Sequence, residues 1–67
     1  MNTIHKTNIR ELREAKGLKQ IEMAKLLGYE STAKYSEIEN GQRGLPIRRA
    51  KEAAKILGCT LDDIFLT

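Results

Sequence analysis

The sequence predicts an all-α fold, a compact five-helix bundle in a single domain over residues 1–67. Five glycines and one proline separate segments whose apolar residues recur at helical spacing. No segment alternates apolar and polar residues with a period of two, the pattern of a half-exposed strand. With 67 residues and 40% apolar composition, the chain has material for one core and no second domain. A deep catalytic cleft is therefore not expected.

The first helix is predicted after an N-terminal tail at residues 1–7. Asn8 has the side chain of an N-cap, and Glu11 lies three residues on, where it would complete a capping box. Gly17 is placed to end this helix in the left-handed conformation. We expect Ile9 and Leu12 to face the core.

The second helix is predicted between Lys19 and Gly28. Met23, Ala24 and Leu27 form its inward stripe. Lys19 occupies the N-cap position, but an ammonium group cannot accept a hydrogen bond from a backbone N–H. This helix is therefore expected to begin without a good side-chain cap.

The third helix is predicted to begin at Ser31 or Thr32, which are both good N-cap residues, and to end at Glu39. Tyr35 and Ile38 share its inward side, and the Tyr35 hydroxyl is expected to reach the surface. The outward side carries two hydroxyls, a methyl group and a carboxylate, from Thr32, Ala33, Ser36 and Glu37, with Lys34 on the flank.

The fourth and fifth helices complete the predicted bundle. Pro46 is a good first residue for the fourth helix and Gly58 a good stop. Its inward stripe consists of Ile47, Ala50, Ala53, Ala54 and Leu57. The last short helix, at residues 60–66, is expected to be capped by Thr60 accepting from the Asp63 amide, with Leu61 and Ile64 facing the core.

Composition narrows the function classes. The chain has 12 Lys+Arg against 9 Asp+Glu, a net charge of +3 that suits a polyanionic partner without demanding one. One cysteine cannot form an internal disulfide, and no apolar run is long enough for a signal peptide or a membrane span. We therefore expect a soluble protein of a reducing compartment, the cytoplasm, that does not contact a membrane.

Catalysis, metal binding and small-molecule binding are not expected. His5 has no second His, Cys or acidic pair at ligand spacing. The sequence contains no nucleophile paired with a base and no phosphate-cradling glycine loop. We therefore predict no enzyme activity, no cofactor and no small-molecule ligand.

Two short helices joined by a glycine turn, the second with a polar outward face, outline a helix-turn-helix at about residues 20–39. Three segments add to this outline: LREAKGLKQIEMAKLLG, YSEIENGQR and AAKILGCTLDDIF. In order and nearly in spacing, they resemble the Cro and lambda-repressor type of helix-turn-helix, the XRE family, over about Ile9 to Phe65. The resemblance implies a lambda-repressor-like DNA-binding domain that binds a double-stranded operator as a homodimer. It also implies a bacterial or phage transcriptional regulator, here expected to be a repressor.

The resemblance also implies roles for individual residues. In the family, the glutamine that opens the second helix, here Gln20, bonds a DNA phosphate and braces the recognition helix, in keeping with the affinity of helix N-termini for phosphate. The residues expected to contact phosphate are Lys19, Gln20, Lys34, Asn40, Gly41 and Arg43. The start of the third helix reads base edges in the family. The base-reading candidates here are Ser31, Thr32, Ala33, Ser36 and Glu37.

Two departures from the family pattern bear on base reading. The spacing from Gly28 to Gly41 is one residue longer than the commonest pattern, which leaves either Ser31 or Thr32 as the first reader. The outward face also has no Arg, Gln or Asn, the usual bidentate partners of guanine and adenine. Thr32 can meet a thymine methyl, and the Glu37 carboxylate can accept from a cytosine amino group or simply be solvated. A carboxylate near phosphates lowers affinity, so base reading is expected to be modest or partly water-mediated.

Two further expectations concern partners. Ile64, Phe65 and Leu66 are more apolar than a terminal turn needs, so we expect Phe65 and Leu66 in a dimer interface. Such a dimer would set two recognition helices about 34 Å apart, one turn of DNA. The alternative function is a protein-interaction module on the same fold, such as an antitoxin or an anti-repressor partner. An acidic, Arg-poor third helix would disfavour that function less than it disfavours DNA binding.

Overall fold

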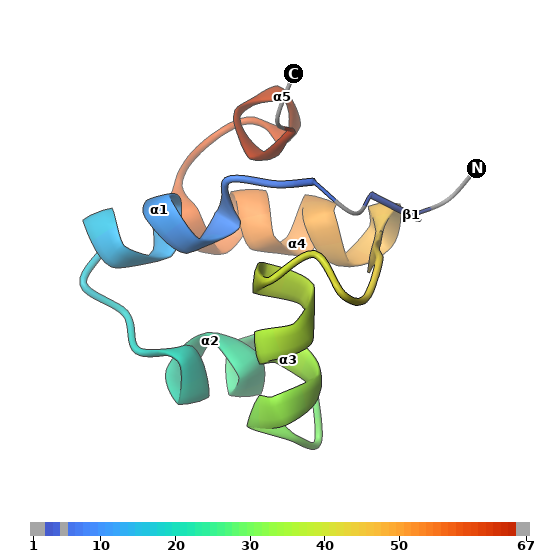
Figure 1. Ribbon diagram of the computed structural model, residues 1–67. Coiled ribbons are helices and arrows are strands. Elements are labelled where there is room, and N and C mark those ends of the chain that lie inside the picture. Colours follow the sequence, from blue (N-terminus) through green and yellow to red (C-terminus); the bar gives the residue numbers. More distant parts are fainter. Residues whose placement is uncertain (1–2, 5, 66–67) are drawn as a thin grey trace.

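The computed structural model, which describes residues 3–4 and 6–65, contains five helices. In chain order these are α1 (Ile9–Ala15), α2 (Gln20–Leu26), α3 (Thr32–Glu39), α4 (Ile47–Leu57) and α5 (Leu61–Ile64). Figure 1 shows α4 running through the middle with α1 beside it. The pair α2 and α3 lies on one side of α4, and α5 lies on the other. The prediction of an all-α five-helix fold is confirmed.

The predicted inward stripes meet in one hydrophobic core. Every helix contributes to it: the buried apolar residues are Ile9, Met23, Ala24, Leu27, Tyr35, Ile38, Leu45, Ala50, Ala53, Ala54, Leu57 and Ile64. Tyr35 is among the largest of the fully buried side chains. The expectation that its hydroxyl reaches the surface is wrong, because this group is buried and has no hydrogen-bond partner among the described residues.

Helix capping agrees with the sequence prediction at two helices. Ser31 is the N-cap of α3, where its side chain accepts from the Ala33 N–H at 3.1 Å. At α5 the Thr60 hydroxyl accepts from the Asp63 N–H at 3.2 Å, and the Asp63 carboxylate accepts from the Thr60 N–H at 3.0 Å. Because Ser31 is the cap, Thr32 is the first residue of α3.

The other N-terminal ends differ from prediction. Asn8 precedes α1, but its side chain does not cap the helix, since ψ of 30° turns it out of the extended conformation of a capping residue. The Thr7 hydroxyl accepts from the Ile9 N–H instead, at 3.4 Å. The α2 helix has a partial replacement for its missing cap, because the Lys19 N–H donates to Glu22 Oε1 at 2.8 Å. Pro46 is the N-cap of α4 and not its first helical residue.

A small antiparallel sheet was not predicted. Strand β1 (Thr3–Ile4) pairs with β2 (Leu45–Pro46), and a further bridge joins Thr7 to Phe65. Strands of two residues are too short to show an alternating pattern in the sequence. The sheet ties the start of the chain to the segment that follows the α3 loop (Figure 1).

The lengthened turn between α2 and α3 is held by Arg49 of α4. Its guanidinium donates to the Leu27 carbonyl at the end of α2 and lies 5.0 Å from the ring centroid of Tyr29, a cation–π contact. The Tyr29 ring packs against Tyr35, with the centroids 6.1 Å apart. Gly28 has φ of +83°, and a Cβ there would lie 3.0 Å from Arg49 Nη1. Tyr29, within this turn, is thus packed against Arg49 of α4, and the turn is part of the folded domain.

Candidate nucleic-acid interface

The base-reading candidates lie together on the outer side of α3. Ala33 and Lys34 are exposed on its first turn, while the inner side is fixed in the core by Tyr35 and Ile38. The partly exposed members of the set are Ser31, Thr32, Ser36 and Glu37. In Figure 1 the first turn of α3 is at its outer end, away from α1 and α4. A surface of small side chains is therefore presented on one short helix.

A buried carboxylate anchors the opposite end of α3. The Glu39 side chain is 0% exposed and accepts from Arg13 Nε at 2.7 Å and from Arg13 Nη2 at 3.2 Å, a bidentate ion pair. Gln20 Nε2 donates to the same carboxylate at 3.0 Å. Because Arg13 belongs to α1 and Gln20 to α2, this single group joins three helices.

The remaining donors around Glu39 extend this network. Arg13 is 7% exposed, and its Nη1 donates to the Leu18 carbonyl at 2.6 Å, in the turn between α1 and α2. Arg10 Nε lies 3.5 Å from Glu39 Oε1, and its Nη2 donates to Asn40 Oδ1 at 2.6 Å. The residue at which the α3 loop begins is thus also attached to α1.

The network sets the ionisation of its members. Burial alone would raise the pKa of Glu39, but the hydrogen bonds from Arg13, and further contacts from Tyr35 and Gln20, outweigh it and hold this pKa below its ordinary value. The same hydrogen bond raises the pKa of Arg13. Burial, followed by the neighbouring Glu39, raises the pKa of Tyr35. The folded protein therefore keeps both Arg13 and Glu39 in their charged forms.

The phosphate candidates fall into two groups. The Gln20–Glu39 hydrogen bond brings the start of α2 beside the end of α3, so Lys19 and Gln20 lie near Asn40. Gly41 and Arg43 follow in the loop, where Gly41 has φ of +80°. All of the phosphate candidates except the partly exposed Gln20 are exposed: Lys19, Lys34, Asn40, Gly41 and Arg43. Lys34 is apart from this group, on the first turn of α3.

Arg43 and Glu37, which were expected to act separately, are ion-paired. Arg43 Nε and Nη2 each lie 3.0 Å from Glu37 Oε1. The two side chains are 49% and 44% exposed. A member of the base-reading set is therefore in direct contact with a member of the phosphate set.

Sequence reasoning missed the role of Arg13 and Glu39. Each looked like an ordinary surface charge, and the two are 26 residues apart. One signal was available, because Arg13 lies four residues after Ile9 and therefore shares the inward side of α1. A charge on an inward side requires a buried partner, although the sequence does not say which acid supplies it.

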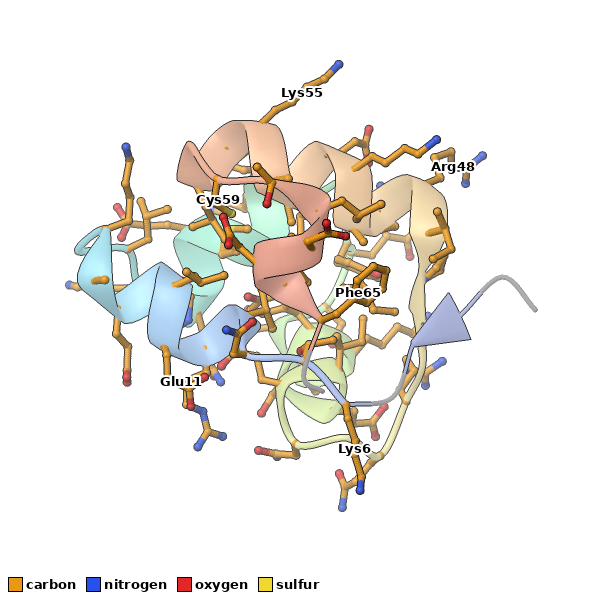
Figure 2. All side chains as sticks on the ribbon, turned by 90° about the horizontal axis from the view of Figure 1, so that it is seen from above. Lys6, Glu11, Arg48, Lys55, Cys59 and Phe65 are labelled. Atoms are coloured by element: carbon orange, nitrogen blue, oxygen red, sulfur yellow. The ribbon has the colours of Figure 1, made fainter. Side chains whose placement is uncertain are left out.

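The other predicted features are placed as follows. Phe65 is partly buried at the end of α5, where Figure 2 shows it beside the incoming N-terminal segment. Leu66 lies outside the described residues. The described part of the chain holds no group of three or more potential metal-ligating side chains, and no helix long and apolar enough to cross a membrane.

Removing the Glu39 charge should reduce both stability and its acid dependence. Glu39→Gln leaves the buried Arg13 guanidinium without its counter-ion, at a cost of about 3 kcal/mol in free energy of unfolding at pH 7. The pKa of Glu39 is lower in the folded state than its ordinary value of 4.5, so wild type should lose stability as pH falls below that value. Denaturant unfolding at several pH values should give a shallower acid slope for Glu39→Gln. Glu30→Gln, at an exposed turn position, should keep the wild-type slope; a wild-type slope in Glu39→Gln would contradict this account.

Comparison with known proteins agrees with this geometry. A family model described as helix-turn-helix matches residues 9–64, which include all five helices. A search of curated proteins finds no matching sequence. The matched region covers most of the chain, with the two-helix unit α2–α3 inside it. The chain therefore belongs to the Cro/C1-type helix-turn-helix family, the XRE family of DNA-binding regulators.

Proposed function

We propose that this protein is a sequence-specific DNA-binding repressor that inserts α3 into the major groove of an operator. The observation that carries the proposal is the contrast between the two sides of α3. Its inner side is fixed by the core and its last residue, Glu39, by Arg13, while its outer side carries the short side chains of Thr32, Ala33 and Ser36. A rigid helix with a short-chain outer surface can approach base edges closely. The proposed site of action is the cytoplasm, on nucleoid DNA.

Base reading is assigned to the first turns of α3. Thr32 and Ala33 offer methyl groups for thymine, and Ser36 offers a hydroxyl that can donate or accept. The Ser31 hydroxyl oxygen accepts from the Ala33 N–H, so its own proton is left to donate to a base or a phosphate. These contacts are individually modest, which predicts limited discrimination at each base pair.

Phosphate contacts are assigned to both ends of the helix-turn-helix. Gln20 has two N–H groups on Nε2, and one of them is used by Glu39, which leaves the second for a phosphate oxygen. Arg43, Lys19 and Lys34 supply positive charge. The Asn40 side chain accepts from Arg10 through Oδ1, which leaves its Nδ2 N–H groups for a phosphate oxygen, and Gly41 lets the loop turn at this point. Backbone contacts of this kind fix the position of α3 in the groove.

Substitutions of phosphate-contacting and of base-reading residues should have different effects on DNA binding. Arg43→Ala should weaken binding to all duplexes alike and reduce the salt slope by about one charge, because it removes a phosphate contact. Thr32→Ser removes only a methyl group, so it should change the preference at one base pair and keep the salt slope. Fluorescence anisotropy on a panel of duplexes over a salt series measures both quantities.

Lys55→Ala is the matched control for Arg43→Ala. Lys55 is an exposed cation on α4 that points away from the body of the molecule in Figure 2. Lys55→Ala should leave the affinity for DNA and the salt slope nearly unchanged. Equal losses in Lys55→Ala and Arg43→Ala would mean that binding follows net charge and not this surface.

The dimer is proposed to form through Phe65 and Leu66. In Figure 1, α5 lies on the side of α4 opposite to α2 and α3, so an interface there would leave both recognition helices uncovered. Phe65→Asp and Leu66→Asp should halve the mass measured by sedimentation, because a charge at an apolar interface disfavours association. Thermal melting checks that each variant is folded, and a folded variant with unchanged mass would exclude this interface.

A protein partner is the second candidate function. The observation that favours it is on α2, where Ile21 and Leu26 are 49% and 57% exposed although both are large and apolar. A protein-interaction module on this fold, such as an antitoxin or an anti-repressor partner, would use these side chains as contacts. Absence of salt-dependent DNA binding would favour this candidate over the first.

A further inference from the structure

The pairing of Glu37 with Arg43 leaves one side of the guanidinium available. Nε and Nη2, which both approach Glu37 Oε1, define one edge of the planar group. The adjacent edge, formed by Nη1 and the second N–H of Nη2, has no partner within the described part of the chain. Two parallel N–H groups of this kind match two oxygens of a phosphate.

The backbone around this pair is also fixed by Glu37. Its carbonyl oxygen accepts from the N–H of Gln42 at 2.9 Å and from the N–H of Arg43 at 3.2 Å. The backbone of the loop after α3 is therefore bound to the Glu37 carbonyl. The ion pair between the Arg43 side chain and the Glu37 carboxylate is a second attachment. Substitution of the Glu37 side chain alters only the second attachment.

We propose that Glu37 is a positioning residue, which holds Arg43 with its unpaired edge toward a DNA phosphate and does not itself read a base. The inference rests on the proposed DNA-binding function. An arginine side chain has several rotatable bonds, so an unpaired Arg43 would lose conformational entropy on reaching a phosphate. The ion pair with Glu37 fixes part of that geometry before DNA arrives.

Glu37 has two opposing effects on affinity, and the test must separate them. Its negative charge repels nearby phosphates, whereas its contact with Arg43 favours phosphate binding. Glu37→Gln and Glu37→Ala remove the same charge, but only glutamine keeps a carbonyl oxygen that can accept from Arg43. Comparison of these two variants cancels the charge effect.

The experiment measures the affinity of both variants, alone and with Arg43→Ala, for a mixed-sequence duplex of about 30 base pairs at several salt concentrations. Glu37→Gln should bind about threefold more tightly than Glu37→Ala, a difference typical of one exposed side-chain contact. The difference should disappear when Arg43 is alanine, and base preference should be the same in both variants. Glu30→Gln and Glu30→Ala, at an exposed turn position, should bind equally and serve as the matched control pair.

Four results would overturn the inference. Equal binding by Glu37→Gln and Glu37→Ala would leave only the charge effect. A difference that persists without Arg43, or a changed base preference, would assign Glu37 a direct contact with DNA. Absence of salt-dependent binding by wild type would overturn the proposed function itself, and the inference with it. Unfolding midpoints of all variants confirm that each comparison is made between folded proteins.

Discussion

The arrangement of the surface proposed to face DNA depends on one buried carboxylate. Glu39 is the last residue of α3, and its fully buried side chain is bound by Arg13 of α1 and Gln20 of α2. A buried charge is tolerated only when it is paired and hydrogen-bonded, so these three helices must meet in one relative position for the network to form. The apolar core supplies the driving force for folding, and the network selects this arrangement of α1, α2 and α3.

The consequence appears at both ends of α3. At the C-terminal end, the helix is held by Glu39, by Asn40 through Arg10, and by the loop hydrogen bonds to Glu37. At the N-terminal end, the lengthened turn is packed under Arg49, and Ser31 caps the first turn. The outer side of the helix can therefore be made of small residues without becoming mobile. In the proposed function, the position of α3, and not the length of its side chains, brings it to the base edges.

Charge is distributed unevenly over this surface. Lys19 and Arg43 flank α3 in the chain and Lys34 lies on its first turn, whereas α3 has no arginine of its own. In the proposed function, attraction to the DNA backbone and base reading are carried by different residues, with the Glu37–Arg43 pair at the boundary between them. This division favours affinity that depends strongly on salt and specificity that is built from several weak contacts.

Local features of the fold were predictable because each has a nearby cause in the sequence. The inward stripes of α2 and α4, the Ser31 cap and the Thr60–Asp63 capping pair follow from spacing within a few residues. The features that were missed depend on distant partners. The sheet joins residues 3–4 to 45–46, and the Arg13–Glu39 pair spans 26 residues. The predicted capping box of Asn8 and Glu11 failed for the same reason, because the Asn8 N–H donates at 3.0 Å to the carbonyl of Ile64, far along the chain.

Selection of binding sites from a pool of random duplexes, followed by affinity measurements over a salt series, tests the central claim most directly. The account predicts enrichment of a sequence with two symmetric half-sites about 10 base pairs apart, because a two-fold dimer presents two copies of α3 on one face of DNA. It also predicts that the logarithm of the affinity falls steeply with the logarithm of salt concentration. A pool that shows no enrichment, together with a salt slope near zero, would contradict the assignment of this surface to DNA.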